Sequence, residues 1–439
     1  MEHAVNIPIY TLIPFVLMLG AIAVLPLVAH HWWESNRNKL IVSLVLGIPT
    51  AIYLLANNLS HELMHIVLFD YVPFIILLGS LFVITGGIFV EGDIESKPIV
   101  NTTILAIGAV LASVMGTTGA AMLLIRPLIQ TNSQRKHKVH TILFFIAVVA
   151  NCGGLLTPLG DPPLFMMYLR GADFFWFTGL IWEWALANGI ILIVYFAVDT
   201  YFHKKELPED IKFDHDNIKP FSITGKINFI FLAGVVLGVA FINANTLPFI
   251  MENPNLAFLR EGVLVLMLLL SLKFTESVTR AKNQFNWEPI VEVAYLFIGI
   301  FVTMVPALEY LKTHANELGI TDPAHFYYAT GALSGFLDNT PTAVTFYYLE
   351  LGLVNLNPQL IASGEVVAGI PGTIMAAISV AAVFFGAMTY IGNGPNFMVK
   401  AIAESQGIKM PDFFSYMFKF SLIVLLPIFI LLQLIFFPF

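Results

Sequence analysis

Charged side chains are scarce in this chain. Of 439 residues, 11% are Asp, Glu, Lys or Arg, less than half the roughly 25% of an average soluble domain. A soluble protein needs polar residues every few positions along its surface helices. Residues 41–56, 72–90 and 412–439 show no such spacing. With 58% hydrophobic residues, the composition predicts a polytopic membrane protein whose main partner is the lipid bilayer.

Further absences exclude other classes of protein. The single cysteine, Cys152, excludes an intrachain disulfide framework. The formal net charge of −8 gives no basic field for nucleic acid, so no nucleic-acid partner is expected. The first residues lack the basic region and cleavage site of a signal peptide. We therefore interpret residues 8–29 as a retained first span.

Apolar windows of about the length of a membrane span, roughly 20 residues, follow one another along the chain. They fall at about 8–29, 38–56, 72–90, 99–130, 140–170, 178–200, 226–244, 257–272, 289–308, 324–353, 365–403 and 412–438. The windows at 99–130 and 324–353 carry a polar break near the middle, which predicts re-entrant helical hairpins. Those at 140–170 and 365–403 are typical of interrupted spans. The predicted fold is all-α, with about 10 spans and 2 hairpins.

Lysine and arginine are missing from some loops and concentrated in others. Residues 57–71 and 244–256 contain none, whereas 135–138, 204–226 and 273–282 are rich in them. By the positive-inside rule the basic loops are cytoplasmic. With both termini outside, every loop reaches its expected side if the two hairpins enter from opposite faces. The expected location is the inner membrane of a bacterium.

The two halves of the chain resemble each other around the breaks. Aligning Gly116 with Asp338 brings the two hairpin tips together, and aligning Asp161 with Asn393 superimposes the two interrupted spans. Each half runs span, hairpin, broken span and final span, and the halves start from opposite sides. This order predicts two repeats of inverted topology, which place a substrate near the bilayer midplane where the breaks converge.

The breaks gather oxygen-bearing side chains at membrane depth. Asp161 and Asp338 are the acidic residues within the predicted breaks, and an intramembrane carboxylate is a functional candidate by default. Asp is also a favoured helix N-cap, so a capping role for each remains open. Carboxylate, hydroxyl and amide oxygens are the ligands of hard cations. The candidate cation and proton site comprises Asn151, Thr157, Asp161, Thr117, Thr118, Asp338, Asn339, Thr340, Thr342 and Asn393.

No lysine or arginine occurs in any of the four breaks. An anionic substrate would have to be neutralised by helix N-termini or by a co-bound cation, whereas two aspartates serve a cation directly. We therefore predict Na⁺ at Asp161 and Asp338, in exchange for protons on the same carboxylates. No cofactor is expected beyond the transported ions. Glu292, a few residues into the span at 289–308, faces either the bundle or the headgroups.

Three segments of the breaks resemble the ion transporter superfamily. Residues 151–154 read NCGG, residues 157–163 read TPLGDPP and residues 336–342 read FLDNTPT. The nearest branches are the NhaD-type sodium/proton antiporters, the arsenite permeases and the citrate transporters. The resemblance covers the chain from about residue 72 onward. Carried over to matching positions, it implies a substrate site at Asn151, Thr157, Asp161, Asp338, Asn339, Thr340 and Asn393.

The resemblance also implies a homodimer, in which a transport region moves relative to a scaffold region in an elevator-like or rocking cycle. The expected division is scaffold spans at 1–71, repeat 1 at 72–202, a cytoplasmic linker at 203–225, scaffold spans at 226–286 and repeat 2 at 287–439. The dicarboxylate branch shows Ser-Asn-Thr at both hairpin tips. Here the tips read Gly116-Thr117-Thr118 and Asp338-Asn339-Thr340, which departs from that signature.

Several alternatives stay open beside Na⁺ (or Li⁺)/H⁺ antiport. The Gly-Asp-Pro-Pro segment also resembles arsenite permeases, so export of arsenite or another oxyanion is one alternative. Uptake of citrate or a metal–citrate complex is a second. A channel would need a continuous polar path, against which the opposed hairpins argue. An intramembrane enzyme would need a nucleophile and a base, and Cys152 has no histidine nearby in sequence. The chain is therefore not expected to be an enzyme.

Overall fold

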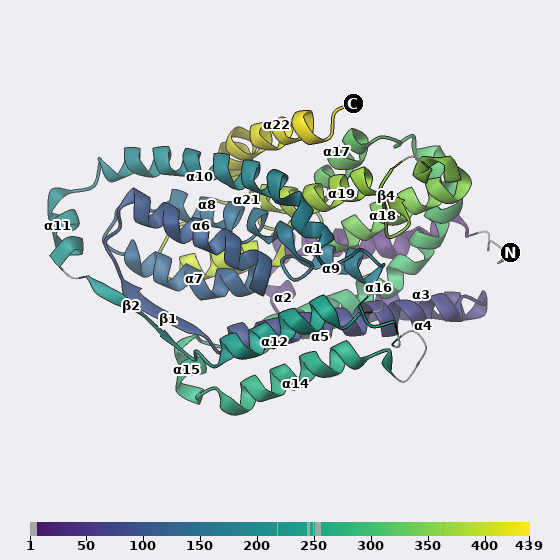
Figure 1. Cartoon of the computed structure of the whole chain (residues 1–439), viewed down its shortest axis with the longest axis horizontal. Coiled ribbons are helices and arrows are strands. Elements are labelled where there is room, and N and C mark those ends of the chain that lie inside the picture. Colours follow the sequence, from purple (N-terminus) through teal and green to yellow (C-terminus); the bar gives the residue numbers. More distant parts are fainter. Residues whose placement is uncertain (1–6, 217, 244–245, 249, 251–255, 363) are drawn as a thin grey trace.

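Helices form nearly all of the regular structure (Figure 1). The computed structural model describes residues 7–216, 218–243, 246–248, 250, 256–362 and 364–439. The extreme N-terminus, whose predicted side was outside, and most of the lysine-free loop at 244–256 lie outside these residues. Within the described part, the strands form two short antiparallel pairs. The prediction of an all-α polytopic membrane protein is confirmed.

The long helices match the predicted spans. Eight helices of the described chain are long and apolar enough to cross a bilayer. They are η1–α1 (Ile9–Val28), α3 (Asn36–Ala56), α4–η2–α5 (Ser60–Thr85), α6 (Pro98–Met115), α8–η3 (Val139–Leu156), η4–α10 (Trp176–His203), α16–η6 (Glu288–Leu318) and α21–η9–α22 (Phe413–Phe436). Shorter apolar helices are α12 (Asn228–Phe241) and α19–η8 (Gly372–Met388). Helix α14 (Leu259–Phe274) follows α12.

The two predicted hairpins are present and point toward each other. In the first, α6 meets α7 (Thr117–Thr131) at Gly116. In the second, α17 (Pro323–Ser334) leads into α18 (Asn339–Leu356). Figure 1 shows the first hairpin in the left half of the molecule and the second in the right half. Gly116 adopts φ +82°, a left-handed conformation that residues with a Cβ rarely adopt, so the tip of the first hairpin requires glycine.

Both predicted broken helices are also present. Helix α8 (Val139–Val148) is followed by η3 (Cys152–Leu156), a non-helical break and α9 (Pro162–Leu169). In the second half, α19 (Gly372–Phe385) is followed by η8 (Gly386–Met388), a break and α20 (Gly394–Ser405). Each second half-helix has proline in its first turn, where the missing N–H is not needed.

Backbone angles repeat between the two breaks. Thr157 has φ −146° and ψ 161°, and its aligned partner Thr389 has φ −141° and ψ 168°. Asp161 has φ −145° and ψ 143°, and Asn393 has φ −150° and ψ 140°. Four angles that agree within ten degrees or so show that the aligned breaks are one structural motif used twice.

Two sequence predictions of element limits need correction. The third span begins at Ser60 rather than at 72, because η2 (Ile66–Tyr71) continues the helix through Asp70. The Asp70 carboxylate is buried and lies 3.1 Å from the Arg170 guanidinium. The predicted window started after Asp70 because this residue is charged, but in the structure its charge is paired with Arg170 inside the protein.

The segment at 203–225 is more than a solvated linker. It contains α11 (Pro208–Asp216) and β2 (Lys219–Thr224), which pairs with β1 (Phe89–Asp93). The start of the window at 365–403 is a second strand pair, β3 (Val366–Val367) with β4 (Ile370–Pro371). The short helices α2 (His30–Trp33), η7 (Pro358–Ile361) and α15 (Ser277–Lys282) complete the connections. In Figure 1, α11, β2 and α15 lie at one end of the molecule, which agrees with the prediction that the basic loops share a side.

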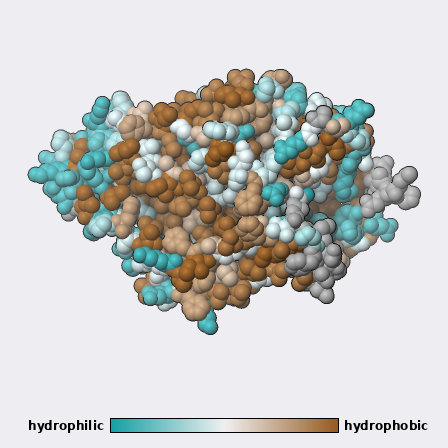
Figure 2. Space-filling model, in the orientation of Figure 1, coloured by the Kyte–Doolittle hydropathy of each residue, from teal (hydrophilic) through white to brown (hydrophobic). Residues whose placement is uncertain are grey.

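A broad hydrophobic surface crosses the middle of the molecule in Figure 2, and hydrophilic residues gather toward its two ends. Large apolar side chains are exposed on several spans, among them Ile193 at 70%, Ile230 at 65% and Ile423 at 65%. An apolar belt of this extent fits contact with lipid. It places the membrane normal along the long axis of Figure 1.

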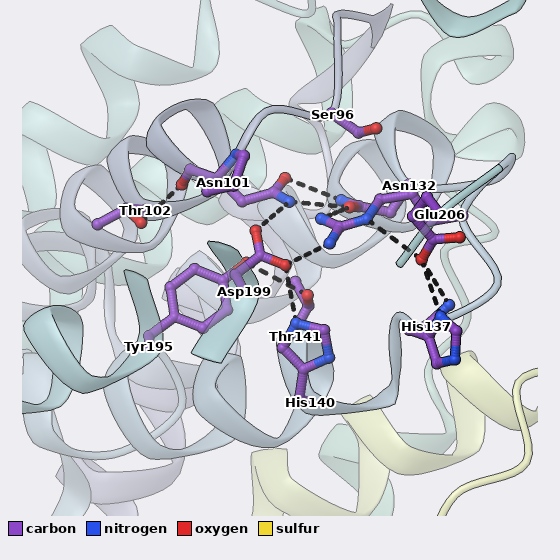
Figure 3. A network of polar contacts seen from close by, with 12 residues as sticks. Ser96, Asn101, Thr102, Asn132, His137, His140, Thr141, Tyr195, Asp199 and Glu206 are labelled. Carbon is purple, nitrogen blue, oxygen red and sulfur yellow. Dashed lines mark hydrogen bonds and ion pairs between the residues drawn. The ribbon is translucent and has the colours of Figure 1, made fainter. Parts of the chain in front are cut away.

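The base of the first hairpin is fastened by a buried polar network (Figure 3). Arg135 Nη2 donates to Asp199 Oδ1 at 2.6 Å, and the ring of His140 lies 2.8 Å from the same oxygen. Asn101 from α6 and Asn132 from the end of α7 exchange two side-chain hydrogen bonds, at 2.8 and 2.9 Å. Asn101 also donates to Asp199 at 3.2 Å. The network ties both hairpin arms to α10.

Glu206 extends this network beyond α10. Its carboxylate accepts hydrogen bonds from the backbone N–H groups of Lys136 at 2.9 Å and His137 at 2.8 Å. Burial raises the pKa of the Glu206 carboxyl, but these N–H donors and the nearby Arg135 charge outweigh burial, so the pKa is lowered from its ordinary value. The loop after α7 is thus held by an ionised glutamate.

Candidate functional site

Asp161 lies where the four breaks meet. Its carboxylate is 1% exposed. Oδ1 accepts from the Thr117 hydroxyl at 2.9 Å and from Asn393 Nδ2 at 3.0 Å, and Oδ2 accepts from Asn339 Nδ2. Among the contacts of the described residues, none joins Asp161 to lysine or arginine. A buried carboxylate with neutral partners alone is a group that can bind either a proton or a cation.

The three partners of Asp161 come from both repeats. Thr117 is the first residue of α7 and aligns with Asn339, the first residue of α18. Asn393 aligns with Asp161 itself, as the residue before the second half-helix of its break. The alignment that predicted an inverted repeat therefore places the corresponding residues of the two halves around one carboxylate.

A second group of amides supports Asn393. Its Nδ2 lies 3.2 Å from Asn151 Oδ1 and 3.2 Å from the Ala150 carbonyl oxygen. Asn151 Nδ2 donates to Asn396 Oδ1 at 2.7 Å. Asn396 in turn donates to the backbone carbonyls of Gly386 and Thr389, at 2.8 and 2.9 Å. These amides join the two breaks into one polar layer inside an apolar protein.

Thr157 and Thr389 shape the breaks rather than bind Asp161. Thr157 Oγ1 donates to the Ser113 carbonyl at 2.5 Å and accepts from the Leu159 N–H at 3.1 Å. Thr389 Oγ1 makes the equivalent pair of bonds, to the Gly335 carbonyl at 2.7 Å and from the Ile391 N–H at 3.1 Å. Each threonine fastens its break to the adjacent hairpin.

Asp338 has a different environment from Asp161. It is half-buried and is the N-cap of α18, where its carboxylate accepts from the Thr340 N–H at 2.9 Å. The Thr342 hydroxyl bonds to the Asp338 backbone carbonyl at 2.9 Å. No hydrogen bond joins Asp338 to Asp161 in the described chain. The capping role left open by the sequence applies to Asp338, whereas Asp161 has no side-chain cap bond.

A cavity of about 450 Å³ reaches this site from one side. Asp338, Asn393 and Thr118 form part of its wall. Other lining residues come from α1, α2, α3 and α16 and include Lys39 and Glu292. The cavity therefore lies between the predicted site residues of the breaks and the helices α1, α2, α3 and α16.

Helix ends at the site balance one another. The helices that begin there are α7 at Thr117, α9 at Pro162, α18 at Asn339 and α20 at Gly394, and those that end there are α6 at Met115, η3 at Leu156, α17 at Ser334 and η8 at Met388. N-termini carry a partial positive charge and C-termini a partial negative one. With as many ends of one kind as of the other, the formal charge of the aspartates decides the sign of the site.

The chain crosses itself closely at paired glycines in each break. A Cβ on Gly160 would lie 2.0 Å from the Gly154 carbonyl oxygen, and one on Gly392 would lie 2.6 Å from the aligned Gly386 oxygen. These obstacles are backbone atoms, which cannot turn aside. The glycines therefore let each break fold back on itself beside Asp161 or Asn393.

We predict that Gly160→Ala disrupts the first break, at a cost of several kcal/mol, on the order of 3. The control is Gly394→Ala, since a Cβ on Gly394 meets no atom within 4 Å. Thermal unfolding of both purified variants in detergent measures the effect. Equal unfolding temperatures for the two variants would contradict the close crossing.

Sequence reasoning found all three partners of Asp161 but missed two other groups. Lys39 stands at the start of the apolar window at 38–56 and was not among the candidate residues, although its side chain is 5% exposed and lines the cavity. Asp199 and Asn101 were overlooked within apolar windows. A carboxylate in the predicted span at 178–200 was the available signal, because such residues face a partner inside the bundle.

Comparison with protein families gave a match over residues 4–437 to the family described as "Putative citrate transport". The match covers both hairpins and both breaks. A search of curated proteins found no match.

Proposed function

Because the chain belongs to this citrate transport family, it is a secondary transporter, and we propose that it exchanges Na⁺ or Li⁺ for H⁺ at Asp161. The observation that carries the proposal is a fully buried carboxylate bound by Thr117, Asn339 and Asn393, all neutral. A desolvated carboxylate with no cationic side chain is stable when a proton or a metal ion neutralises it. One group therefore serves both ions in turn.

The amides can adapt to either ion. In the structure, Asn339 and Asn393 direct N–H groups at the Asp161 oxygens. A turn of each amide by about 180° presents its oxygen instead, and with the Thr117 hydroxyl it would complete an oxygen shell for Na⁺. Asp338 adds a second negative charge on the cavity wall. Proton-bound and cation-bound states then differ by amide rotation.

Alternating access follows from the same architecture. Breaks that meet at one site and hairpins that approach it from opposite ends are typical of transporters that open this site to one side of the membrane at a time. The elevator-like cycle, the homodimer and the inner-membrane location belong to this proposal. The opposed hairpins in Figure 1 support the alternating cycle, whereas the homodimer and the inner-membrane location rest on the resemblance to the ion transporter superfamily and on the basic loops.

Transport of citrate, free or as a metal complex, is the second candidate. The description of the family favours it, and so do the helix N-termini at the site, which attract carboxylates. Against free citrate stand the two aspartates and the matching number of helix C-termini. A metal–citrate complex carries less negative charge and fits the site better than the free anion.

The test uses purified protein in vesicles that contain a pH-sensitive dye. Addition of Na⁺ or Li⁺ outside is expected to alkalinise the lumen, because each cation that enters is exchanged for protons that leave, and K⁺ should have a much weaker effect. Citrate and Mg²⁺–citrate are added in parallel. Flux driven by citrate alone, with no response to Na⁺ or Li⁺, would overturn cation exchange and favour the second candidate.

A further inference from the structure

An ion pair lines the same cavity as Asp338. Lys39 Nζ lies 2.7 Å from Glu292 Oε1. The Lys39 side chain is 5% exposed, whereas that of Glu292 is 41% exposed. Both residues line the cavity that Asp338 and Asn393 also line. A cargo that approaches the site through this space therefore meets the carboxylate of the pair before its ammonium.

Close packing holds the pair in place. Lys39 belongs to α3 and Glu292 to α16. One turn away along both helices, Asn36 Nδ2 donates to the Glu288 carbonyl at 3.1 Å. Farther along, a Cβ on Gly299 would lie 2.7 Å from Ser43 Oγ, so the two helices touch backbone to side chain. The separation of Lys39 and Glu292 is thus fixed by the helices that carry them.

The other charged groups of the cavity have partners of their own. Glu34 lies 3.2 Å from the ring of His30 and is itself exposed. Asp338 accepts the Thr340 N–H at the start of α18. Among the described residues that line the cavity, Lys39 is the only lysine, and none of them is an arginine. Its charge is the feature of the wall that would oppose a cation.

We propose that Glu292 determines the charge specificity of this cavity by masking Lys39. The inference rests on the cation exchange proposed above. With the pair intact, the wall has no net charge at this point and Na⁺ passes to Asp338 and Asp161. Without the Glu292 carboxylate, the Lys39 ammonium acts on the cavity through a medium of low polarity, where a unit charge is felt over several ångströms. The wall then repels cations and attracts anions.

The test compares kinetic constants in vesicles. Glu292→Gln is expected to raise the KM for Na⁺ about tenfold, because a nearby positive charge disfavours cation entry, with a smaller change in the maximal rate. The same variant should bind citrate as a competitive inhibitor more tightly than wild type does. The double variant Lys39→Gln with Glu292→Gln removes both charges, so its KM for Na⁺ should return to within about twofold of wild type.

Glu288→Gln is the matched control, since Glu288 is exposed on the same helix one turn earlier. Its KM should equal that of wild type. A wild-type KM in Glu292→Gln overturns the inference. So does a tenfold increase that persists in the double variant, because Glu292 would then act as a ligand rather than as a mask.

Folding and function are separable in this design. If Glu292→Gln fails to fold with an unpaired buried ammonium, Lys39→Gln and the double variant are compared instead. Lys39→Gln leaves the Glu292 carboxylate unopposed, so its KM for Na⁺ should lie below that of the double variant. Equal KM values in these two variants, or a tenfold increase in the double variant, overturn the inference. If the wild-type protein itself shows no cation-driven proton flux, the proposed function fails and Glu292 is not implicated in that failure.

Discussion

Asp161→Asn is expected to eliminate cation-driven proton flux. A carboxylate about 4 Å from a bound cation contributes about 4 kcal/mol at an effective dielectric constant near 20, which corresponds to roughly 1000-fold in affinity. The variant also loses the group that would carry the proton. Binding of Na⁺ to the purified variant measures the loss of affinity. Proton flux in dye-loaded vesicles measures the loss of transport.

The Asp161→Asn variant should still fold. Asparagine has nearly the shape of aspartate, and its Oδ1 can accept from Thr117 and Asn393 as the carboxylate does. Loss of one charged acceptor costs about 1.5–3 kcal/mol if the donors find no other partner. Substantial flux in the folded variant would remove Asp161 from the mechanism.

Two other aspartates serve as comparisons. Asp338→Asn keeps a favoured N-cap residue on α18, so the variant should transport with a higher KM because the cavity loses one negative charge. Asp322 caps α17 through the His325 N–H, outside the cavity. Asp322→Asn should transport as wild type does. This graded order, from Asp161 to Asp338 to Asp322, distinguishes a binding role from a capping role.

Asp199→Asn is expected to cost about 3–5 kcal/mol of stability, because it removes the carboxylate closest to a buried guanidinium and leaves only Glu206, 3.9 Å from Arg135 Nε, as its anion. The side chains of Arg135 and Asp199 are 3% and 0% exposed. His140 and Asn101 lose their charged acceptor in the same step. Denaturant unfolding in detergent, followed by intrinsic fluorescence, measures the loss.

The control for Asp199 is an exposed ion pair on the same end of the molecule. Lys282 and Glu91 lie 3.2 Å apart with side chains 47% and 60% exposed, and Glu91→Gln should change stability by less than about 1 kcal/mol. Arg135→Met together with Asp199→Leu removes both charges of the pair, and Glu206 keeps the backbone N–H donors of Lys136 and His137, so this variant should recover much of the loss. If Asp199→Asn is as stable as Glu91→Gln, the network does not fasten the hairpin.

The order of spans, hairpins and broken helices could be predicted from the sequence, because glycine and proline inside an apolar window indicate either a hairpin or an interrupted span. Asp161 and Asn393 were aligned from a short match, and the backbone angles of the two interrupted spans agree closely there. Proline and glycine restrict the backbone locally, so these matches carried structural information. Thr117, Asn339 and Asn393 were named for their side-chain oxygens within the breaks, and the structure places all three against Asp161.

Long-range pairing was not accessible in this way. Asp70 pairs with Arg170, Lys39 with Glu292 and Arg135 with Asp199. Each pair joins residues far apart in the chain, and one sequence gives no measure of which charges meet. The window limits failed at Asp70 for this reason, because a charge that is paired within the protein does not end a helix.

The position of Asp161 has a mechanical consequence. Its oxygens accept hydrogen bonds from Asn339 and Asn393, which belong to the other half of the chain. The carboxylate therefore links repeat 1 to repeat 2. An ion that captures these oxygens must displace the amides or turn them around. In the proposed exchange, each change of occupant at Asp161 would therefore change the contact between the two repeats.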